Sequence, residues 1–218
     1  NLSNDYGDSV HGADSSARKG PIRAVQSGLI SLPEMKRAMI FLGLLSLISG
    51  VSLIYLSLPN WSYFLGFLAL GLLAIWAAIR YTSGSNPYGY AGLGDISVFI
   101  FFGLVATMGS YFAQSQEITW RAFLLAIPMG ALSCTILGLN NLRDRPKDEA
   151  VGKKTLAVRL GDARARIFLI LQLFVAFATS IAAAAITPWA LLVLATTPFY
   201  YLLIKGITSG AIGARLIP

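Results

Sequence analysis

WSYFLGFLALGLLAIWAAIRY, the stretch from Trp61 to Tyr81, carries a single charged residue, Arg80, close to its end. An apolar run of about 20 residues, rising about 1.5 Å per residue as a helix, crosses a hydrocarbon core of about 30 Å. The alternating apolar pattern of an outer-membrane barrel strand is absent. The stretch therefore predicts a membrane-spanning helix.

Five further apolar runs of similar length accompany this one. Hydropathy predicts six spans in all: Leu32–Tyr55, Trp61–Tyr81, Leu93–Tyr111, Arg121–Leu139, Ile167–Ala185 and Trp189–Ile204. With 56% hydrophobic and 12% charged residues, the chain is too apolar to leave its surface in water. We predict an all-α, polytopic transmembrane helix bundle. Because the chain opens inside a motif and stops where another apolar segment begins, we expect residues 1–218 to be a single membrane-embedded domain, truncated at both ends.

The formal net charge of +7 could suggest nucleic acid as a partner, so the placement of the charges is decisive. When the connections are assigned alternately to two sides, sixteen of the seventeen Lys/Arg residues share one side and only Arg121 lies on the other. By the positive-inside rule the basic loops are cytoplasmic. We expect the location to be a cell inner membrane. Nine of the ten Asp/Glu residues, all but Glu117, fall on that same side, although carboxylates do not direct topology. Their placement suggests chemistry rather than nucleic-acid binding.

The first acidic cluster is Asn1-x3-Asp5-x2-Asp8. On a helix these positions recur at i, i+4 and i+7 and share one face. A charged side chain at the bilayer centre costs roughly 2.5–3.5 kcal/mol, so acids within or at the edge of a membrane are candidates for function. The alternative is that Asp5 and Asp8 only cap a helix in water.

A second cluster, Asn140-x3-Asp144-x3-Asp148, again places an Asn four residues before an Asp at the end of a span. Two copies of one arrangement favour an internal repeat over two accidental caps. Pro146 disfavours helical geometry at Arg145. We therefore expect Asp144 at a helix end and Asp148 in a loop or a new turn.

Hard oxygen ligands of this kind are those that Mg²⁺ prefers, usually one or two carboxylates together with substrate phosphates. We predict Asp5, Asp8, Asp144 and Asp148 as metal ligands and catalytic residues, with Mg²⁺ as the cofactor. Phosphate charge also needs donors, and part of the basic loops can supply them while the rest anchor topology. The nearby basic residues are Arg18, Lys19 and Arg23 after the first cluster, and Arg143, Lys147, Lys153 and Lys154 around the second.

A Gly- and Tyr-rich connection, residues 80–95, is the third polar element. Its glycines and Pro87 indicate a turn. Tyr88 and Tyr90 can stack on an aromatic substrate, donate hydroxyl hydrogen bonds, or form part of an interfacial aromatic belt. His11 and Cys134 are each the single residue of their type, which indicates neither a disulfide nor a thiolate metal site.

At these motifs the chain resembles the UbiA-type intramembrane prenyltransferases, and more narrowly their 1,4-dihydroxy-2-naphthoate polyprenyltransferase branch. The resemblance covers essentially the whole chain. It is carried by Asn1-x3-Asp5-Tyr6-x-Asp8-x3-Gly12-x-Asp14, Gly20-Pro21-x-Arg23-x2-Gln26-x-Gly28, Pro87-Tyr88-Gly89-Tyr90-x-Gly92-Leu93-Gly94-Asp95 and Asn140-Asn141-Leu142-Arg143-Asp144-x3-Asp148-x3-Gly152-Lys153-x-Thr155-Leu156. The chain departs from many relatives at Ser85 and Asn86, where they have a lysine whose phosphate-binding role is absent here or taken by Arg80.

The resemblance implies a fold of nine helices around a central cavity open to lipid, with both acidic clusters under cytoplasmic loops. It also implies Mg²⁺-dependent transfer of a polyprenyl group from its diphosphate to 1,4-dihydroxy-2-naphthoate, with loss of the carboxyl group, to give demethylmenaquinone. The partners are then a polyprenyl diphosphate, an aromatic acceptor and the lipid bilayer. The residues expected to bind substrate are Asn1, Asn4, Arg18, Arg23, Tyr88, Tyr90, Asn140, Asn141, Arg143 and Lys153.

Two alternatives remain open. One is prenylation of 4-hydroxybenzoate or another phenolic acceptor. The other is a secondary transporter, since intramembrane acids and an apparent repeat are also found there. Transport sites usually lie near the midplane, whereas these acids lie at span ends.

Overall fold

The computed structural model describes residues 2–11, 22–58 and 60–210, and within these ranges all regular secondary structure is helical. The chain forms two compact units, residues 1–91 and 92–218. Six helical stretches are long and apolar enough to cross a membrane: Leu32–Ser57, Trp61–Arg80, Gly94–Ser115, Trp120–Ala150, Leu156–Ala185 and Pro188–Thr208. The prediction of an all-α membrane bundle is confirmed, and the chain is a multi-pass membrane protein.

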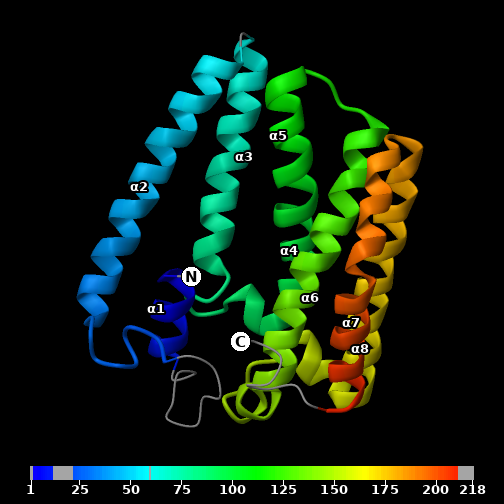
Figure 1. The fold of residues 1–218 in the computed structure, drawn as a ribbon. Coiled ribbons are helices and arrows are strands. Elements are labelled where there is room, and N and C mark those ends of the chain that lie inside the picture. Colours follow the sequence, from blue (N-terminus) through cyan, green and yellow to red (C-terminus); the bar gives the residue numbers. More distant parts are fainter. Residues whose placement is uncertain (1, 12–21, 59, 211–218) are drawn as a thin grey trace. The chain divides into compact units, whose positions relative to one another are not determined.

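The first unit contains α1 (Leu2–Val10), α2 (Leu32–Ser57), α3 (Trp61–Arg80) and the short η1 (Tyr88–Ala91). α2 and α3 run side by side in opposite directions, and α1 packs against α2 (Figure 1). α2 begins with a capping box, in which the backbone N–H groups of Ser31 and Glu34 bond the side chain of the other residue. Such a cap satisfies backbone donors that would otherwise be orphaned where the chain enters the span.

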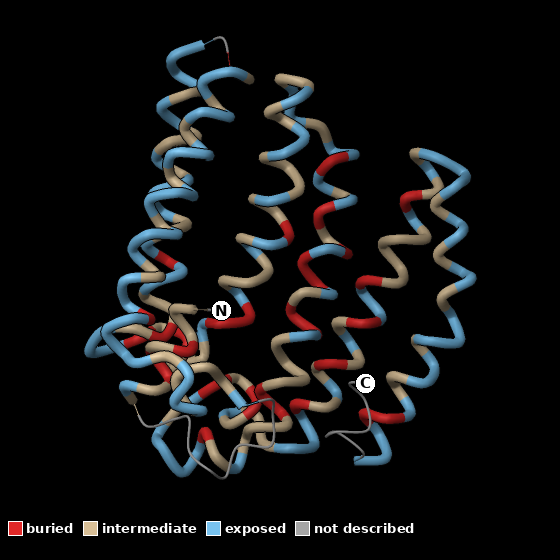
Figure 2. The backbone as a smooth tube through the Cα atoms, turned by 60° about the vertical axis from the view of Figure 1, so that its left-hand side comes forward, coloured by how far each residue is buried: buried red, intermediate tan, exposed pale blue. Residues whose placement is uncertain are grey.

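The second unit begins with one continuous span made of α4 (Gly94–Val98), the π-helical η2 (Phe99–Val105) and α5 (Ala106–Ser115). It continues with α6 (Trp120–Ala150), α7 (Leu156–Ala182), the short η3 (Ala183–Ala185) and η4 (Pro188–Thr196), and α8 (Thr197–Thr208). Residues buried within the protein concentrate on α6 and α7 and are few along α2 and α3 (Figure 2).

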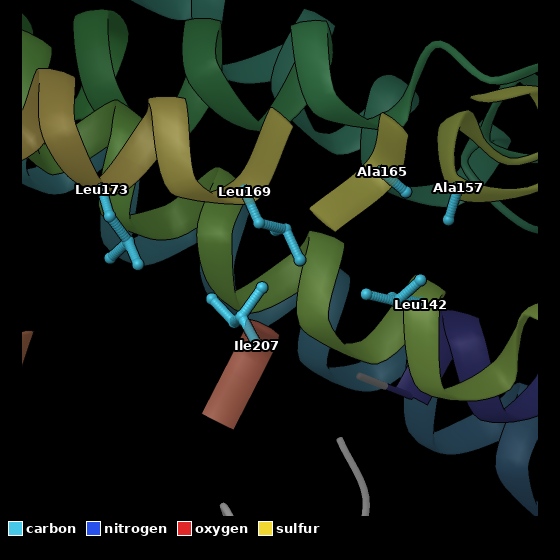
Figure 3. Close-up of a cluster of buried hydrophobic side chains, with 6 residues drawn as sticks. All are labelled: Leu142, Ala157, Ala165, Leu169, Leu173 and Ile207. Atoms are coloured by element: carbon cyan, nitrogen blue, oxygen red, sulfur yellow. The ribbon is translucent and has the colours of Figure 1, made fainter. Parts of the chain in front are cut away.

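α6, α7 and α8 share a core of small and branched apolar side chains (Figure 3). Its members are Leu142, Ala157, Ala165, Leu169, Leu173 and Ile207. Close approach is possible because Gly138 has no side chain: a Cβ there would lie 2.5 Å from Leu169 Cδ2. This packing fixes α6, which carries the second acidic cluster, against α7.

Two helices are longer than hydropathy predicted, although the other boundaries agree to within a few residues. α6 continues past Leu139 to Ala150, and α7 begins at Leu156 rather than Ile167. Both extensions are rich in charged residues, so the apolar pattern ends before the helix does. α7 also bends at Gly161, whose φ of 74° and ψ of 172° lie outside the helical region.

The expectation that Pro146 would separate Asp144 from Asp148 is wrong. α6 runs through Pro146 without a break, so the two carboxylates lie on one helix at i and i+4. A proline removes one backbone donor and its ring crowds the carbonyl four residues earlier, but in membrane proteins neighbouring helices and side chains can compensate for both. Here Leu142 and Asp148 are both buried on either side of Pro146, so packing holds the helical conformation.

Candidate active site

The first acidic cluster forms on α1, where Asp5 and Asp8 lie three residues apart on one face, 8% and 5% exposed. α1 packs tightly against the segment that follows α3. A Cβ at Gly7 would lie 2.5 Å from the backbone oxygen of Thr82, and the buried Thr82 hydroxyl donates to Ser3 O at 2.7 Å. The absence of a side chain at Gly7 therefore allows the contact that holds this helix in place.

Both oxygens of Asp8 accept hydrogen bonds. Arg23 Nη1 donates to Asp8 Oδ2 at 2.7 Å and to the Asn4 backbone oxygen at 2.8 Å. The Tyr90 hydroxyl donates to Asp8 Oδ1 at 2.8 Å. Two of the predicted substrate-binding residues, Arg23 and Tyr90, thus orient a predicted metal ligand.

Asp5 has a different environment. Its Oδ1 is buried and receives no hydrogen bond from any described residue. A buried carboxylate oxygen without a partner is costly, and a bound cation would remove that cost. With Asp8 one turn away, the pair offers the hard oxygen ligands that suit Mg²⁺.

Among the residues that the structure describes, no group of three or more Asp, Glu, His or Cys side chains converges on one point. Mg²⁺ commonly uses only one or two carboxylates and takes its other ligands from water and substrate phosphates. The carboxylate pairs on α1 and α6 are therefore compatible with the predicted cofactor.

The connection after α3 is held by its own hydrogen bonds. The Tyr88 hydroxyl donates to the Ala77 backbone oxygen at 2.8 Å, and its ring meets Tyr81 edge-on at a centroid distance of 5.5 Å. His11 places its ring nitrogens 2.7 Å from Gly7 O and 3.1 Å from Gly84 O. Tyr88 and His11 thus stabilise the connection itself.

The second cluster pairs each acid with a base within the second unit. Arg143 donates to both oxygens of Asp144 at 2.8 Å, in a bidentate ion pair. Lys153 Nζ lies 3.7 Å from Oδ1 of the buried Asp148. Asn141 is 9% exposed on the same helix, and its neighbour Asn140 is half-buried.

Two predicted site residues, Asn1 and Arg18, lie outside the described residues. Each of the others lies in the unit that carries its own cluster: Asn4, Arg23, Tyr88 and Tyr90 in residues 1–91, and Asn140, Asn141, Arg143 and Lys153 in residues 92–218.

The predicted site residues did not include the buried polar residues Thr82 and Asp95, which are 1% and 7% exposed, although Asp95 ends one of the motifs that carry the family resemblance. Asp95 lies in the first turn of α4, at the start of a span. An acid inside an apolar span is itself an indicator of function, which could have singled out Asp95. Thr82 has no comparable indicator because threonines are common in such loops.

Comparison with known proteins gives the family of the chain. The model of the UbiA prenyltransferase family matches residues 1–216. A protein of Escherichia coli strain K12 described as 1,4-dihydroxy-2-naphthoate octaprenyltransferase is 48% identical over 166 residues, which cover 76% of this chain and 54% of that protein. No solved structure matches the chain.

Two further proteins with the same description are similar to this chain. The one from Haemophilus influenzae is 47% identical over 176 residues, 81% of this chain and 57% of that protein. The one from Mycobacterium tuberculosis is 40% identical over 218 residues, 100% of this chain and 72% of that protein. The chain thus spans little more than half the length of the first two relatives. With a family match over almost every residue, the chain belongs to the UbiA prenyltransferase family.

Proposed function

We propose that the protein transfers a polyprenyl group from its diphosphate to 1,4-dihydroxy-2-naphthoate, with loss of the carboxyl group as CO₂, which gives the quinol form of demethylmenaquinone. The observation that carries the proposal is the buried Asp5–Asp8 pair, in which Asp5 Oδ1 receives no hydrogen bond from a described residue. The descriptions of the relatives support this choice of acceptor.

Asp5, Asp8, Asp144 and Asp148 are the residues that would hold Mg²⁺. When bound, the ion would neutralise charge on the departing diphosphate, which is electrostatic stabilisation of the transition state. Hydrogen bonds from Arg23 and Tyr90 fix the orientation of the Asp8 carboxylate before a metal ion binds.

The basic residues at the clusters have two roles in this proposal. Three basic residues each form an ion pair with an acid: Arg23, Arg143 and Lys153. These pairs balance the negative charge of Asp8, Asp144 and Asp148 before substrate binds. Guanidinium groups also match the planar geometry of phosphate oxygens. At the first cluster, Asn1, Asn4 and Arg18 are the further residues proposed to bind diphosphate. At the second cluster, they are Asn140 and Asn141.

The apolar spans protect the reaction from water. An allylic cation develops as the carbon–oxygen bond to the diphosphate breaks, and water would capture it. Tyrosine faces such as that of Tyr88 can stabilise a nearby cation. The electron-rich acceptor ring then attacks the allylic carbon, and the carboxyl group at the attacked ring carbon leaves as CO₂.

We also propose that residues 1–218 act as one membrane-embedded domain in the cell inner membrane, with the basic loops and both clusters on the cytoplasmic side. The family match over residues 1–216 and the distribution of Lys/Arg support this. A long prenyl tail can then stay in hydrocarbon while the head group reacts near the interface.

The test is a turnover assay on membranes that contain the protein. Polyprenyl diphosphate is supplied with 1,4-dihydroxy-2-naphthoate or with 4-hydroxybenzoate, with and without Mg²⁺, and the product is identified by mass spectrometry. The proposal predicts a prenylated naphthalene product that requires the cation. Absence of prenylated product under every condition contradicts the proposed activity. Product from 4-hydroxybenzoate but none from 1,4-dihydroxy-2-naphthoate contradicts the proposed choice of acceptor.

A further inference from the structure

A second polar site lies within the second unit, around Asp95. Its carboxylate is 7% exposed although it belongs to the membrane-spanning stretch Gly94–Ser115. No ion pair joins it to a described residue, and the one side-chain hydrogen bond that it accepts is a long one, 3.4 Å from Gln172 Nε2. Burying a carboxylate so weakly compensated is costly, which indicates a use for it.

Gln172 also has a buried oxygen that accepts no hydrogen bond from a described residue. Its Nε2 is directed to Asp95, but its Oε1 is buried and receives no hydrogen bond from any described residue. Cys134 Sγ donates at 3.1 Å to the backbone oxygen of Asp95, so the thiol is committed to the main chain. The carboxylate and the amide oxygen are both acceptors, and the group that would satisfy them is therefore a hydrogen-bond donor.

A small cavity lies beside Asp95, the hydrogen-bond partner of Gln172. Asp95 and Asn141 supply its polar lining, and the rest of the lining is apolar, with Leu160 and Phe168 from α7 among it. It has room for about one water-sized group, which is the size of a hydroxyl and far smaller than an aromatic ring. Gly138 also lines it, and a Cβ at Gly138 would lie 2.5 Å from Leu169 Cδ2 and 3.8 Å from Gln172 Oε1, so the amide oxygen lies near this part of the lining, where Leu169 packs against the glycine.

The cavity is close to the second acidic cluster along α6. Asn141 lines the cavity and precedes Asp144 by three residues, a rise of about 4.5 Å. A ring lying beside this part of α6 could place one hydroxyl in the cavity while the rest of the molecule stays outside it.

We propose that Asp95 and Gln172 form a binding site for a hydroxyl group of the aromatic acceptor, which donates its hydrogen bond to them. The inference rests on the proposed function for the identity of the acceptor, and it adds residues that select a hydroxylated ring. A site built from buried acceptors rejects an analogue that lacks the donor, because the acceptors then stay unpaired. An ordered water molecule is the other donor of this size.

The experiment compares three acceptors on the membrane protein: 1,4-dihydroxy-2-naphthoate and its two mono-O-methyl ethers. The variants are Asp95→Asn, which keeps the shape and removes the charge, and Gln172→Met, which removes the amide. Gln114→Met is the matched control, since Gln114 is exposed on α5 and, among the described residues, bonds only Ser110 O of its own helix. Two quantities are measured: kcat/KM for each acceptor, and the acceptor-induced rise in unfolding temperature without prenyl diphosphate.

For the wild-type protein we expect one of the methyl ethers to be at least about tenfold poorer than the diol, by turnover and by thermal shift. Asp95→Asn and Gln172→Met should lower kcat/KM for the diol about tenfold and leave that ether within about twofold of its wild-type value, so that selectivity is lost. The KM for prenyl diphosphate and the behaviour of Gln114→Met should not change.

Equal losses on diol and ethers would assign the site to water or to packing and overturn the inference. So would a wild-type protein that does not distinguish the three compounds. If no acceptor is turned over, the proposed function fails, but the thermal shifts without prenyl diphosphate still decide whether the variants lose selectivity for the hydroxyl.

Discussion

Among the four clustered acids, Asp5 alone lacks a basic partner within the described residues. Asp8 accepts from Arg23 and Tyr90, Asp144 from Arg143, and Asp148 lies near Lys153. Charge-assisted hydrogen bonds hold Asp8 and Asp144 in one orientation before any ligand binds, and a longer ion pair of 3.7 Å joins Asp148 to Lys153. Asp5 keeps a buried oxygen available, which makes it the most direct candidate for a metal ligand.

Asp5→Asn should abolish turnover while leaving membrane insertion and thermal stability almost unchanged. The substitution removes a buried charge that no described residue compensates at Oδ1, so the folded state loses little, whereas the cation loses a ligand. Asp144→Asn should likewise abolish turnover. Asp162→Asn is the control, because Asp162 forms an exposed pair with Arg166 elsewhere on α7. A parallel loss of folded protein and of turnover would assign Asp5 a structural role instead.

Tyr90→Phe should raise the Mg²⁺ concentration required for half-maximal turnover by about tenfold or more. The change removes only the hydroxyl that orients Asp8, and loss of such supporting bonds typically weakens metal affinity 10- to 100-fold. Tyr88→Phe is the matched comparison, since that hydroxyl bonds the backbone oxygen of Ala77. The Mg²⁺-induced rise in unfolding temperature gives a second readout. An identical Mg²⁺ response in both variants would contradict the role of Tyr90.

For individual residues, the sequence predicts the candidates for function better than it predicts the hydrogen bonds between them. Acids in an apolar chain are conspicuous, so Asp5 and Asp144 could be found from composition and spacing. The bond from Tyr90 to Asp8 joins residues 82 positions apart, and only packing brings them together. Asp95 ends one of the motifs that carry the family resemblance, but next to Gly94 it looks like the end of a turn and was not predicted as a site residue.

At the scale of helices, hydropathy predicts the apolar spans but not the charged ends of the helices. The six spans follow from apolar runs and are confirmed, whereas the charged extensions of α6 and α7 resemble loops in the sequence. Pro146 was misjudged for a related reason: its local preference is weaker than the packing of the helix around it. The consequence is functional, because an unbroken α6 keeps Asp144 and Asp148 in a fixed spacing.

Gly161→Ala should destabilise the protein by about 1–3 kcal/mol. Gly161 has φ 74° and ψ 172°, a backbone conformation that residues with a Cβ rarely adopt, although nothing lies within 4 Å of an added Cβ. Gly50→Ala is the control, since Gly50 lies inside α2 with open space around it and should gain up to about 1 kcal/mol. Thermal unfolding in detergent measures both. Equal stability of the two variants would contradict the bend at Gly161.

For the whole molecule, the distribution of charge is the basis of the proposed topology. Sixteen of seventeen Lys/Arg residues fall on one side of the alternating connections. That side also carries both acidic clusters, so substrate diphosphate would be taken from the cytoplasm.

Labelling of introduced cysteines with a membrane-impermeant maleimide tests this topology. The native Cys134 is 3% exposed and should give little background. In intact cells Glu117→Cys should be labelled and Lys154→Cys should be protected until the membrane is opened. Both positions are exposed in the folded chain, so burial does not explain a difference. Labelling of Lys154→Cys alone would reverse the proposed orientation.

The most direct test of the proposed activity is to follow the carboxyl carbon of the acceptor. 1,4-Dihydroxy-2-naphthoate labelled in its carboxyl group is incubated with polyprenyl diphosphate, Mg²⁺ and membranes containing the protein, and released CO₂ is counted against prenylated product. We predict one labelled CO₂ for each prenyl group transferred, and neither product nor CO₂ with Asp5→Asn. Prenylated product that retains the label, or no product at all, would contradict the proposed reaction.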